Sequence, residues 1–153
     1  MEPILDATQM ELPPTAYAGF WIRFGAAFID GIILAVVQIP VALILFGGMM
    51  IKAEAVQNEL KSVLYYYVII GFLHMIYFSV MESSSYQATL GKRALGLKVV
   101  DLNGERIFLG HAIGRYLSKF PSAMILLIGY MMAGWTEKKQ ALHDMIAGTY
   151  VVK

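Results

Sequence analysis

The chain has 153 residues, of which 58% are hydrophobic and only 15% are charged, and its formal net charge at pH 7 is +1. Soluble domains carry about 25% charged residues, and a chain of this length cannot hide such an apolar excess in one core, so the composition predicts a membrane protein. The small net charge argues against electrostatic binding of nucleic acid, and the absence of cysteine excludes disulfides, thiolate metal sites and a cysteine nucleophile.

The N-terminal segment is acidic and contains the pair Pro13-Pro14. It lacks the basic start and the continuous apolar run of a cleavable signal, so we expect it to stay attached. The predicted organisation is therefore a flexible acidic N-terminus over residues 1–16, followed by one membrane domain over residues 17–153.

Two segments are long and apolar enough to cross a hydrocarbon core of about 30 Å as helices. The first is predicted at about 24–51, with Pro40 expected to kink it because proline has no N–H to donate. The second is predicted at about 62–81, with tyrosines toward its ends as in an interfacial aromatic belt. The short polar connector at 52–61 would make the two helices an antiparallel hairpin.

The polar loop after the second span predicts a β-hairpin with strands at about 98–102 and 105–108. Its residues alternate in polarity, and Asn103-Gly104 suits a two-residue type I′ turn, which needs two positive φ angles. Because an isolated hairpin is marginal in water, we expect the strand-like tail at 149–152 to add a third strand. That pairing would bring the C-terminus beside the loop.

A third membrane segment is predicted at about 112–135. Arg115 and Lys119 lie in its first third, and Pro121 is expected to break it. Two interpretations remain open at this point. The segment is either one tilted helix with snorkelling basic side chains, or a broken helix that dips into the membrane and returns.

The distribution of Lys and Arg tests the topology, because cytoplasmic loops carry an excess of these residues. The stretch from 92 to 119 holds six of them, so we expect it and the N-terminus to be cytoplasmic. A full third crossing leaves five basic residues outside against these six, whereas a re-entrant segment gives nine inside against two outside. We therefore favour an all-α, multi-pass protein of the cell (inner, cytoplasmic) membrane: a transmembrane hairpin, a third Pro-broken membrane helix and a small cytoplasmic β-hairpin.

Ionisable residues in the apolar helices carry the functional signal, because each costs at least about 2.5–3.5 kcal/mol at a helix centre without a partner or water. Arg23 and Asp30 share a face of the first helix but lie about 10 Å apart along its axis, so each needs a partner from elsewhere. Arg115 and Asp144 are the candidates. Small residues at positions 26, 27, 31 and 35 on that face predict the close approach of another helix. The alternative is that Arg23 only snorkels and Asp30 pairs locally.

The remaining polar residues give weaker signals. His74 could relay protons within the second span, although a neutral histidine bonded to a neighbour is the more common case. No second ligand cluster accompanies His143 and Asp144, so we expect neither a metal nor another cofactor. Residues 89–92 resemble a phosphate-binding loop without its first glycine, and contact of this basic loop with anionic lipid is the simpler role. With no nucleophile beside a base, we expect no enzyme.

Three motifs occur in order: YAGFWIRFGAAFIDGIIL, TLGKRALGLKVVDLNGERI and ALHDMIAGTYVV. With them the chain resembles, over residues 17–152, the RDD family of small bacterial and archaeal membrane proteins, which is named for an arginine and two aspartates. Arg23 and Asp30 match the first two of these residues, and Asp144 matches the second aspartate. Arg115 also looks like a family feature.

The resemblance implies a transport role, and cation/proton antiport has been attributed to some relatives. A carboxylate in a low dielectric can exchange a proton for a monovalent cation, and we expect Asp30 to do so. A hairpin plus one helix is too small for an alternating-access pathway, so a transporter of this size is expected to be a homo-oligomer. The alternative is a non-transporting scaffold or accessory module, whose charges only lock the helices together and whose basic loop binds membrane lipids or a partner protein.

The last expectation joins topology to chemistry. Asp144 should lie beside the face of Arg23 and Asp30, with Arg115 nearby, in one network of two cations and two carboxylates. Two acids and two bases neutralise each other where any one of them alone would be expensive to bury. This requires the tail to return to the side on which the first helix begins, because a full third crossing would place Asp144 about 30 Å away.

Overall fold

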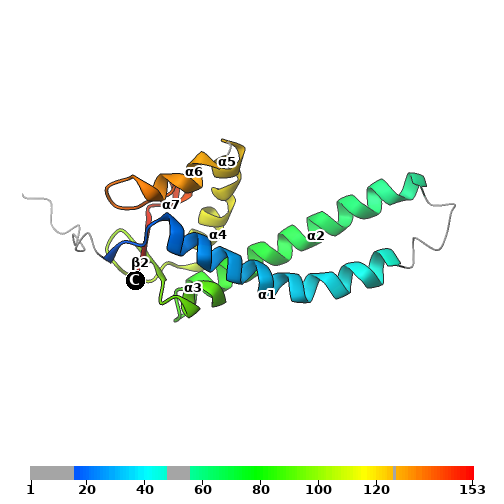
Figure 1. The fold of residues 1–153 in the computed structure, drawn as a ribbon, viewed down its shortest axis with the longest axis horizontal. Coiled ribbons are helices and arrows are strands. Elements are labelled where there is room, and N and C mark those ends of the chain that lie inside the picture. Colours follow the sequence, from blue (N-terminus) through cyan, green and yellow to red (C-terminus); the bar gives the residue numbers. More distant parts are fainter. Residues whose placement is uncertain (1–15, 48–55, 126) are drawn as a thin grey trace, which may run out of the picture.

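The computed structural model describes residues 16–47, 56–125 and 127–153. Two long helices extend together from a compact end, at which the short helices and the strands gather (Figure 1). The start of the first helix and the C-terminus both lie at this compact end (Figure 1). The flexible N-terminus predicted at 1–16 falls almost entirely outside the described residues.

The two long helices are α1, Phe20–Gly47, and α2, Val56–Ser83. Within them, Phe20–Ile44 and Val63–Ser83 are long and apolar enough to cross a membrane, with mean hydropathies of 2.3 and 1.8. Both predicted spans are therefore confirmed. The predicted connector is too long, because α2 already begins at Val56. Helix α1 continues through Pro40, and residues 48–55 lie outside the described part of the chain.

The two spans offer their side chains mostly outward. In each span only 6% of the most apolar window is buried within the chain. The helices lie close together near the compact end and diverge away from it (Figure 1). Such a surface suits a hydrocarbon solvent, where exposed apolar side chains carry no hydrophobic penalty.

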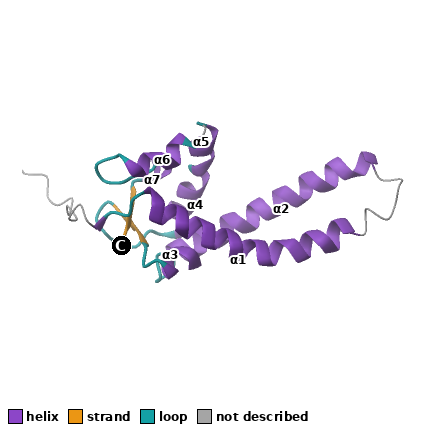
Figure 2. Ribbon diagram, in the orientation of Figure 1, coloured by secondary structure: helices purple, strands orange, loops and turns teal. Residues whose placement is uncertain are grey.

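The strands form a small sheet at the compact end, drawn orange in Figure 2. Strand β1, Lys98–Asp101, pairs antiparallel with β2, Thr149–Val152. On the other side of β2, the N–H of Ala18 donates to the carbonyl of Val151 over 2.8 Å, which brings the residues before α1 alongside the tail. The tail is thus a strand beside the loop, as predicted, and its pairing with two segments relieves the weakness of an isolated pair.

The second strand of the predicted hairpin does not form. Beyond Gly104 only an isolated bridge joins Val100 to Arg106. The Asp101 side chain accepts the N–H groups of Asn103 and Glu105, each over 2.8 Å, and so holds the turn locally. Only the glycine has a positive φ here, +82°, so the connection is a three-residue loop ending in a left-handed glycine and not the expected type I′ turn.

The third predicted membrane segment is a series of short helices. Helix α4 ends at Leu117, whose carbonyl cannot receive the usual bond because Pro121 has no N–H, and this confirms the proline break. A sharper bend of 116° follows α5, where Leu127 has φ of +63°. The interpretation of this segment as one straight, tilted helix is therefore wrong. The elements are α4 Leu109–Leu117, α5 Lys119–Met124, α6 Ile128–Met131, the 3-10 helix η2 Met132–Gly134 and α7 Leu142–Ala147.

This bent segment returns the chain to its starting side. After η2, helix α7 and strand β2 pack at the compact end, and the hydrophobic core there joins residues from both termini of the domain. This arrangement agrees with the re-entrant alternative, because the chain after the bend packs beside the start of α1. The short helix α3, Leu90–Ala94, completes this end by packing against α1. The core comprises Ala18, Ala26, Leu97, Val99, Ile107, Ala112 and Val151.

Candidate functional site

Arg23 reaches the C-terminal motif, as the sequence predicted. It lies on the first turns of α1, and its Nη1 donates to Oδ2 of Asp144, 121 residues along the chain. Its two other nitrogens are also used, because Nε donates to the carbonyl of Ala18 over 2.8 Å and Nη2 to that of Lys139 over 2.6 Å. The side chain is only 12% exposed, so Arg23 is fixed inside the protein and does not snorkel.

Arg115 occupies the centre of the buried charges. Its Nη2 donates to Oδ1 of Asp144 over 2.5 Å, its Nη1 to Oε2 of Glu82 over 2.7 Å, and its Nε to the Thr149 hydroxyl over 3.1 Å. The residue is 1% exposed. Glu82 in turn accepts from Nζ of Lys92 over 2.5 Å. Arg23, Asp144, Arg115, Glu82 and Lys92 thus form one continuous chain of ion pairs, which we call the charge network.

The charge network is built from five elements. Its members come from α1, α7, α4, the end of α2 and α3. In low dielectric, each carboxylate between two cations repays part of the cost of burying all of them. Burial alone raises the pKa of Asp144, but the nearby guanidinium groups of Arg115 and Arg23 outweigh it and hold that pKa well below its usual range. The network therefore keeps this carboxylate ionised at the compact end.

Asp30 is buried, as predicted, but it is not a member of the network. It is 1% exposed, and no described cation pairs with it. It accepts from the hydroxyl of Thr89 over 2.5 Å, the backbone N–H of Gly91 over 2.7 Å and the hydroxyl of Tyr77 over 2.9 Å. The expectation that Asp30 belongs to the charge network is wrong, because hydroxyls and a backbone amide satisfy it in place of a cation.

Helix α3 approaches α1 closely at Asp30. A Cβ placed on Gly91 would lie 2.2 Å from the carbonyl oxygen of Ala26 and 2.8 Å from Cγ of Asp30. Thr89 both caps α3, by accepting the N–H of Lys92, and donates to Asp30. A helix therefore approaches this face of α1 closely, as the sequence predicted. The approaching helix is the short α3, and the small residue that the contact requires is Gly91.

Sequence reasoning missed Glu82 and Lys92 as site residues. Glu82 stands at the polar end of an apolar span, where a charged residue normally needs no special partner. Its position in the sequence therefore did not indicate that it is buried. Lys92 was assigned to a basic loop on anionic lipid, and Tyr77 to an interfacial belt. The run from Thr89 to Lys92 could have indicated these contacts. Its hydroxyl and glycine N–H donate to Asp30, and its ammonium donates to Glu82.

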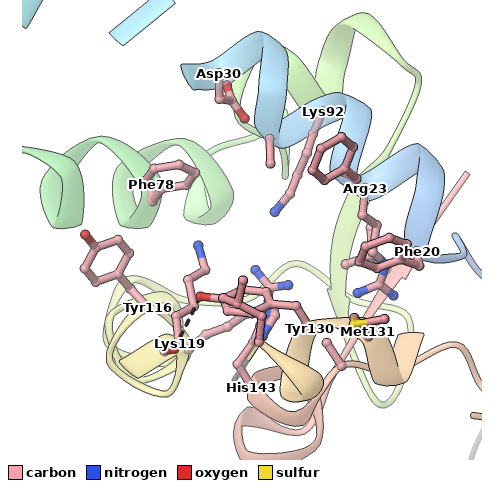
Figure 3. A pocket seen from close by; sticks show the side chains of 16 residues that line it. Phe20, Arg23, Asp30, Phe78, Lys92, Tyr116, Lys119, Tyr130, Met131 and His143 are labelled. Carbon is pink, nitrogen blue, oxygen red and sulfur yellow. Dashed lines mark hydrogen bonds between the residues drawn. The ribbon is translucent and has the colours of Figure 1, made fainter. Parts of the chain in front are cut away.

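A cavity of about 500 Å³ lies beside the charge network (Figure 3). Lys92 and Lys119 point into it from opposite walls (Figure 3). Lys119 pairs with no described carboxylate, and its Nζ lies over the ring of Phe78, 4.1 Å from the centroid. Aromatic and aliphatic side chains make up most of the remaining wall: Phe20, Phe24, Tyr116, Leu127, Tyr130 and Met131.

His143 also lines the cavity. It is 6% exposed, its Nε2 lies 3.4 Å from Oδ1 of Asp144, and its Nδ1 has no hydrogen-bond partner among the described residues. Burial, together with the positive charges of Arg115 and the nearby lysines, outweighs the attraction of Asp144 and lowers the pKa of His143 to about 3. The imidazole is therefore neutral at physiological pH.

His74 lies apart from this cavity. Its Nε2 contacts the side-chain amide of Gln38 on α1, and its ring packs edge-on against Phe78 with centroids 6.5 Å apart. This is the common arrangement of a histidine bonded to a neighbour. The proposed proton relay through His74 stays a prediction.

The fold and the charge network define a small integral membrane protein, in which two spans carry a compact charged end. The model of the RDD family matches residues 17–148, so the chain belongs to the RDD family. Its resemblance to that family, stated from the three sequence motifs, is confirmed.

Three relatives from Bacillus subtilis (strain 168) are similar over most of their length. Uncharacterized protein YxaI is 40% identical over 146 residues, which cover 88% of this chain and 96% of YxaI. Uncharacterized membrane protein YteJ is 29% identical over 150 residues, covering 94% and 85% of the two chains. Uncharacterized protein YckC is 28% identical over 139 residues, covering 88% and 83%. No solved structure matches the chain significantly.

Proposed function

We propose that the protein transports ions or small solutes and that the cavity beside the charge network is its solute site. One observation carries the proposal: the cavity is lined by a buried carboxylate, Asp30, and by an ammonium group, Lys119, neither of which forms an ion pair with a described residue. Intramembrane charges without a partner are expensive and mark ion or substrate sites. Both groups lie where the spans meet the compact end.

Asp30 is the carboxylate that we propose for proton and monovalent-cation exchange. An ionised carboxylate offers about four acceptor positions, and three donors occupy Asp30, so one position remains for a proton or a cation. In contrast, Asp144 and Glu82 each bind two cations within the network. An exchange step at either of them would leave a buried cation without its partner, which makes Asp30 the better candidate.

A homo-oligomer is part of this proposal. The two spans diverge and bury little of their surface, so one chain alone encloses no path across the membrane in the part that the structure describes. A path through the bilayer then needs the spans of further copies. We also propose that the compact end faces the cytoplasm, because nine Lys and Arg residues follow the second span in the sequence, against two between the spans.

The second candidate is a non-transporting accessory module. The observation in its favour is that both carboxylates of the charge network are held by cations of the same chain, as in a set of charges that only locks helices together. In that case Asp30 merely fixes α3 against α1.

Flux into proteoliposomes separates the two candidates. Purified protein is reconstituted with a pH-sensitive dye inside the vesicles, and a gradient of Na⁺ or K⁺ is imposed. Transport predicts proton movement that wild type supports and that falls to the level of empty vesicles in Asp30→Asn. The matched control is Glu105→Gln, the same chemical change at an exposed position, which should keep the wild-type rate.

Two results would count against the proposal. Wild-type flux in Asp30→Asn would remove Asp30 from the exchange step. No flux in wild type, with protein that elutes as a folded species, would favour the accessory module.

A further inference from the structure

The cavity has a surplus of positive charge. Four cations line it, and only three buried carboxylates balance them, of which Asp144 and Glu82 are already shared within the charge network. By formal charge one positive charge remains, and Lys119 is the lining basic side chain that forms no ion pair with a described residue. The four cations are Arg23, Lys92, Arg115 and Lys119.

Contacts with aromatic rings do not compensate this charge. The ammonium of Lys119 lies 4.1 Å from the centroid of Phe78 and 5.2 Å from that of Tyr116. Such contacts are attractive by about 0.5–2 kcal/mol, but the rings bring no negative charge and leave ammonium protons free to donate. A bound anion would satisfy the protons that remain.

The rest of the cavity wall is apolar, so it suits a ligand that also has an apolar part. Phe24, Leu127 and Met131 line the cavity, and they are 55%, 58% and 45% exposed, so the apolar wall continues onto the outer surface. Phe24 belongs to a membrane span, so this part of the wall borders lipid. A molecule with an acyl chain can therefore place its headgroup in the cavity and keep its tail in the bilayer.

We propose that the cavity binds an anionic phospholipid of the surrounding membrane, with the phosphate on Lys119 and Lys92 and the acyl chains along Phe24. A second unsatisfied group supports a headgroup with hydroxyls. Nδ1 of His143 is buried and has no partner among the described residues. Because Nε2 faces Asp144, Nδ1 carries the lone pair and is free to accept a hydrogen bond from a hydroxyl. The lipid class is therefore a singly charged phosphodiester whose headgroup carries free hydroxyl groups. This inference rests on the proposed role of the cavity as a ligand site.

Binding is measured by the melting temperature of the purified protein in a neutral detergent. A ligand that binds only the folded state raises that temperature with its concentration. The titrants are dihexanoyl phosphatidylglycerol, dihexanoyl phosphatidylcholine with the same tails and no net charge, and inorganic phosphate as the anion without tails. We expect saturable stabilisation by phosphatidylglycerol and at least tenfold weaker effects of the other two, because a charge-assisted hydrogen bond contributes at least about a factor of ten in affinity.

Variants assign the headgroup contact. Lys119→Gln should bind phosphatidylglycerol about tenfold more weakly, whereas Lys119→Arg, which keeps the charge, should stay within about threefold of wild type. Lys98→Gln removes an exposed lysine on β1 and should bind as wild type does. Because Lys119 forms no ion pair with a described residue, Lys119→Gln should also fold, and the arginine variant keeps the test valid if it does not.

Each contrary result overturns the inference. Equal stabilisation by phosphatidylcholine would show that the cavity does not select a negative charge, and equal binding of inorganic phosphate would show that tails play no part. Unchanged affinity in Lys119→Gln would remove Lys119 as the contact. Lipid binding without ion flux would leave this inference intact while the transport proposal fails. Flux without lipid binding would do the reverse.

Discussion

The charged end of the molecule and the outer part of its helical hairpin differ in what holds them together. At the charged end, five ionised side chains from five elements interlock, and each of the two carboxylates lies between two cations. Along the outer hairpin, apolar side chains face outward, and the described polar contact between the helices joins Gln38 to His74.

The two regions should therefore tolerate substitutions to different degrees. A buried ion pair contributes little net stability when complete but is costly when one partner is lost, so the charged end should respond strongly to single substitutions. The side chains of the outer hairpin have few partners to lose. Exchanging one lipid-facing apolar side chain for another should therefore change stability little.

The largest effect is expected from Asp144→Ala. This change leaves Arg115 and Arg23 buried without their shared carboxylate, and breaking such a pair costs about 3–5 kcal/mol. The free energy of unfolding, measured by denaturant titration in detergent micelles, should fall by that amount. Glu105→Gln, which removes an exposed charge, should change it by less than about 0.5 kcal/mol. Similar small losses in both variants would mean that the charge network does not stabilise the fold.

A second contrast compares two glycines. In Gly91→Ala the new methyl group meets the backbone carbonyl of Ala26, which cannot move aside cheaply, so we expect a loss of about 1–3 kcal/mol. In Gly71→Ala on the outer hairpin, nothing lies within 4 Å of the new methyl group, and the higher helix propensity of alanine should leave stability unchanged or raise it by up to about 1 kcal/mol. Equal losses at both positions would contradict the close packing of α3 on α1.

The pH dependence of unfolding tests the burial of His143. Its pKa is about 3 in the folded protein, against about 6.5 in the unfolded chain, so the unfolded state binds the extra proton first. Stability should therefore fall as the pH drops from about 6.5 toward 4.5, by up to about 1.4 kcal/mol per pH unit. Asp144 stays ionised in both states over this window, because its pKa is about 3.9 in the unfolded chain and is lower still in the folded protein. His143→Gln should flatten the slope, and an unchanged slope would assign the titration to another group.

The smallest effect is expected in the outer hairpin. Gln38→Leu removes the hydrogen bond to His74, and interhelical hydrogen bonds in membranes contribute on average about 0.6 kcal/mol. Unfolding by SDS titration should shift by roughly that amount. A loss as large as that of Asp144→Ala would mean that the outer hairpin, too, depends on a buried polar contact.

Part of this architecture could be predicted from the sequence. The spans follow from length and hydropathy, and charge balance brought Arg23, Arg115 and Asp144 together. The same reasoning failed for Asp30, because charge balance cannot anticipate that two hydroxyls and a backbone N–H would satisfy a carboxylate. Glu82 was missed because a charged residue at the end of a span looks ordinary until the tertiary fold buries it.

The local geometry was predicted less well than the pairing. The tail strand was anticipated, but the second hairpin strand is replaced by a turn in which the Asp101 side chain accepts the N–H groups of Asn103 and Glu105. The bend after α5 has no proline at its apex, and Leu127 adopts a left-handed conformation there that side-chain propensities do not favour. Such features are set by the packing of α5 to α7 and not by local sequence.

Both the charge network and the re-entrant topology require that the two ends of the membrane domain meet on one side of the bilayer. The chain contains no cysteine, and Tyr17 lies opposite Val152 between two backbone hydrogen bonds, so a pair of cysteines introduced there should form a disulfide. The control pair joins Val152 to Lys61, which lies near the beginning of α2. Figure 1 shows that α2 begins far from the compact end.

The most direct measurement combines this cross-link with labelling of single cysteines by a membrane-impermeant maleimide in sealed vesicles of known orientation. The account predicts that Tyr17→Cys/Val152→Cys cross-links while Lys61→Cys/Val152→Cys does not, and that cysteines at positions 153 and 61 are labelled from opposite sides. A missing cross-link in the first pair, together with labelling of positions 153 and 61 from the same side, would contradict it.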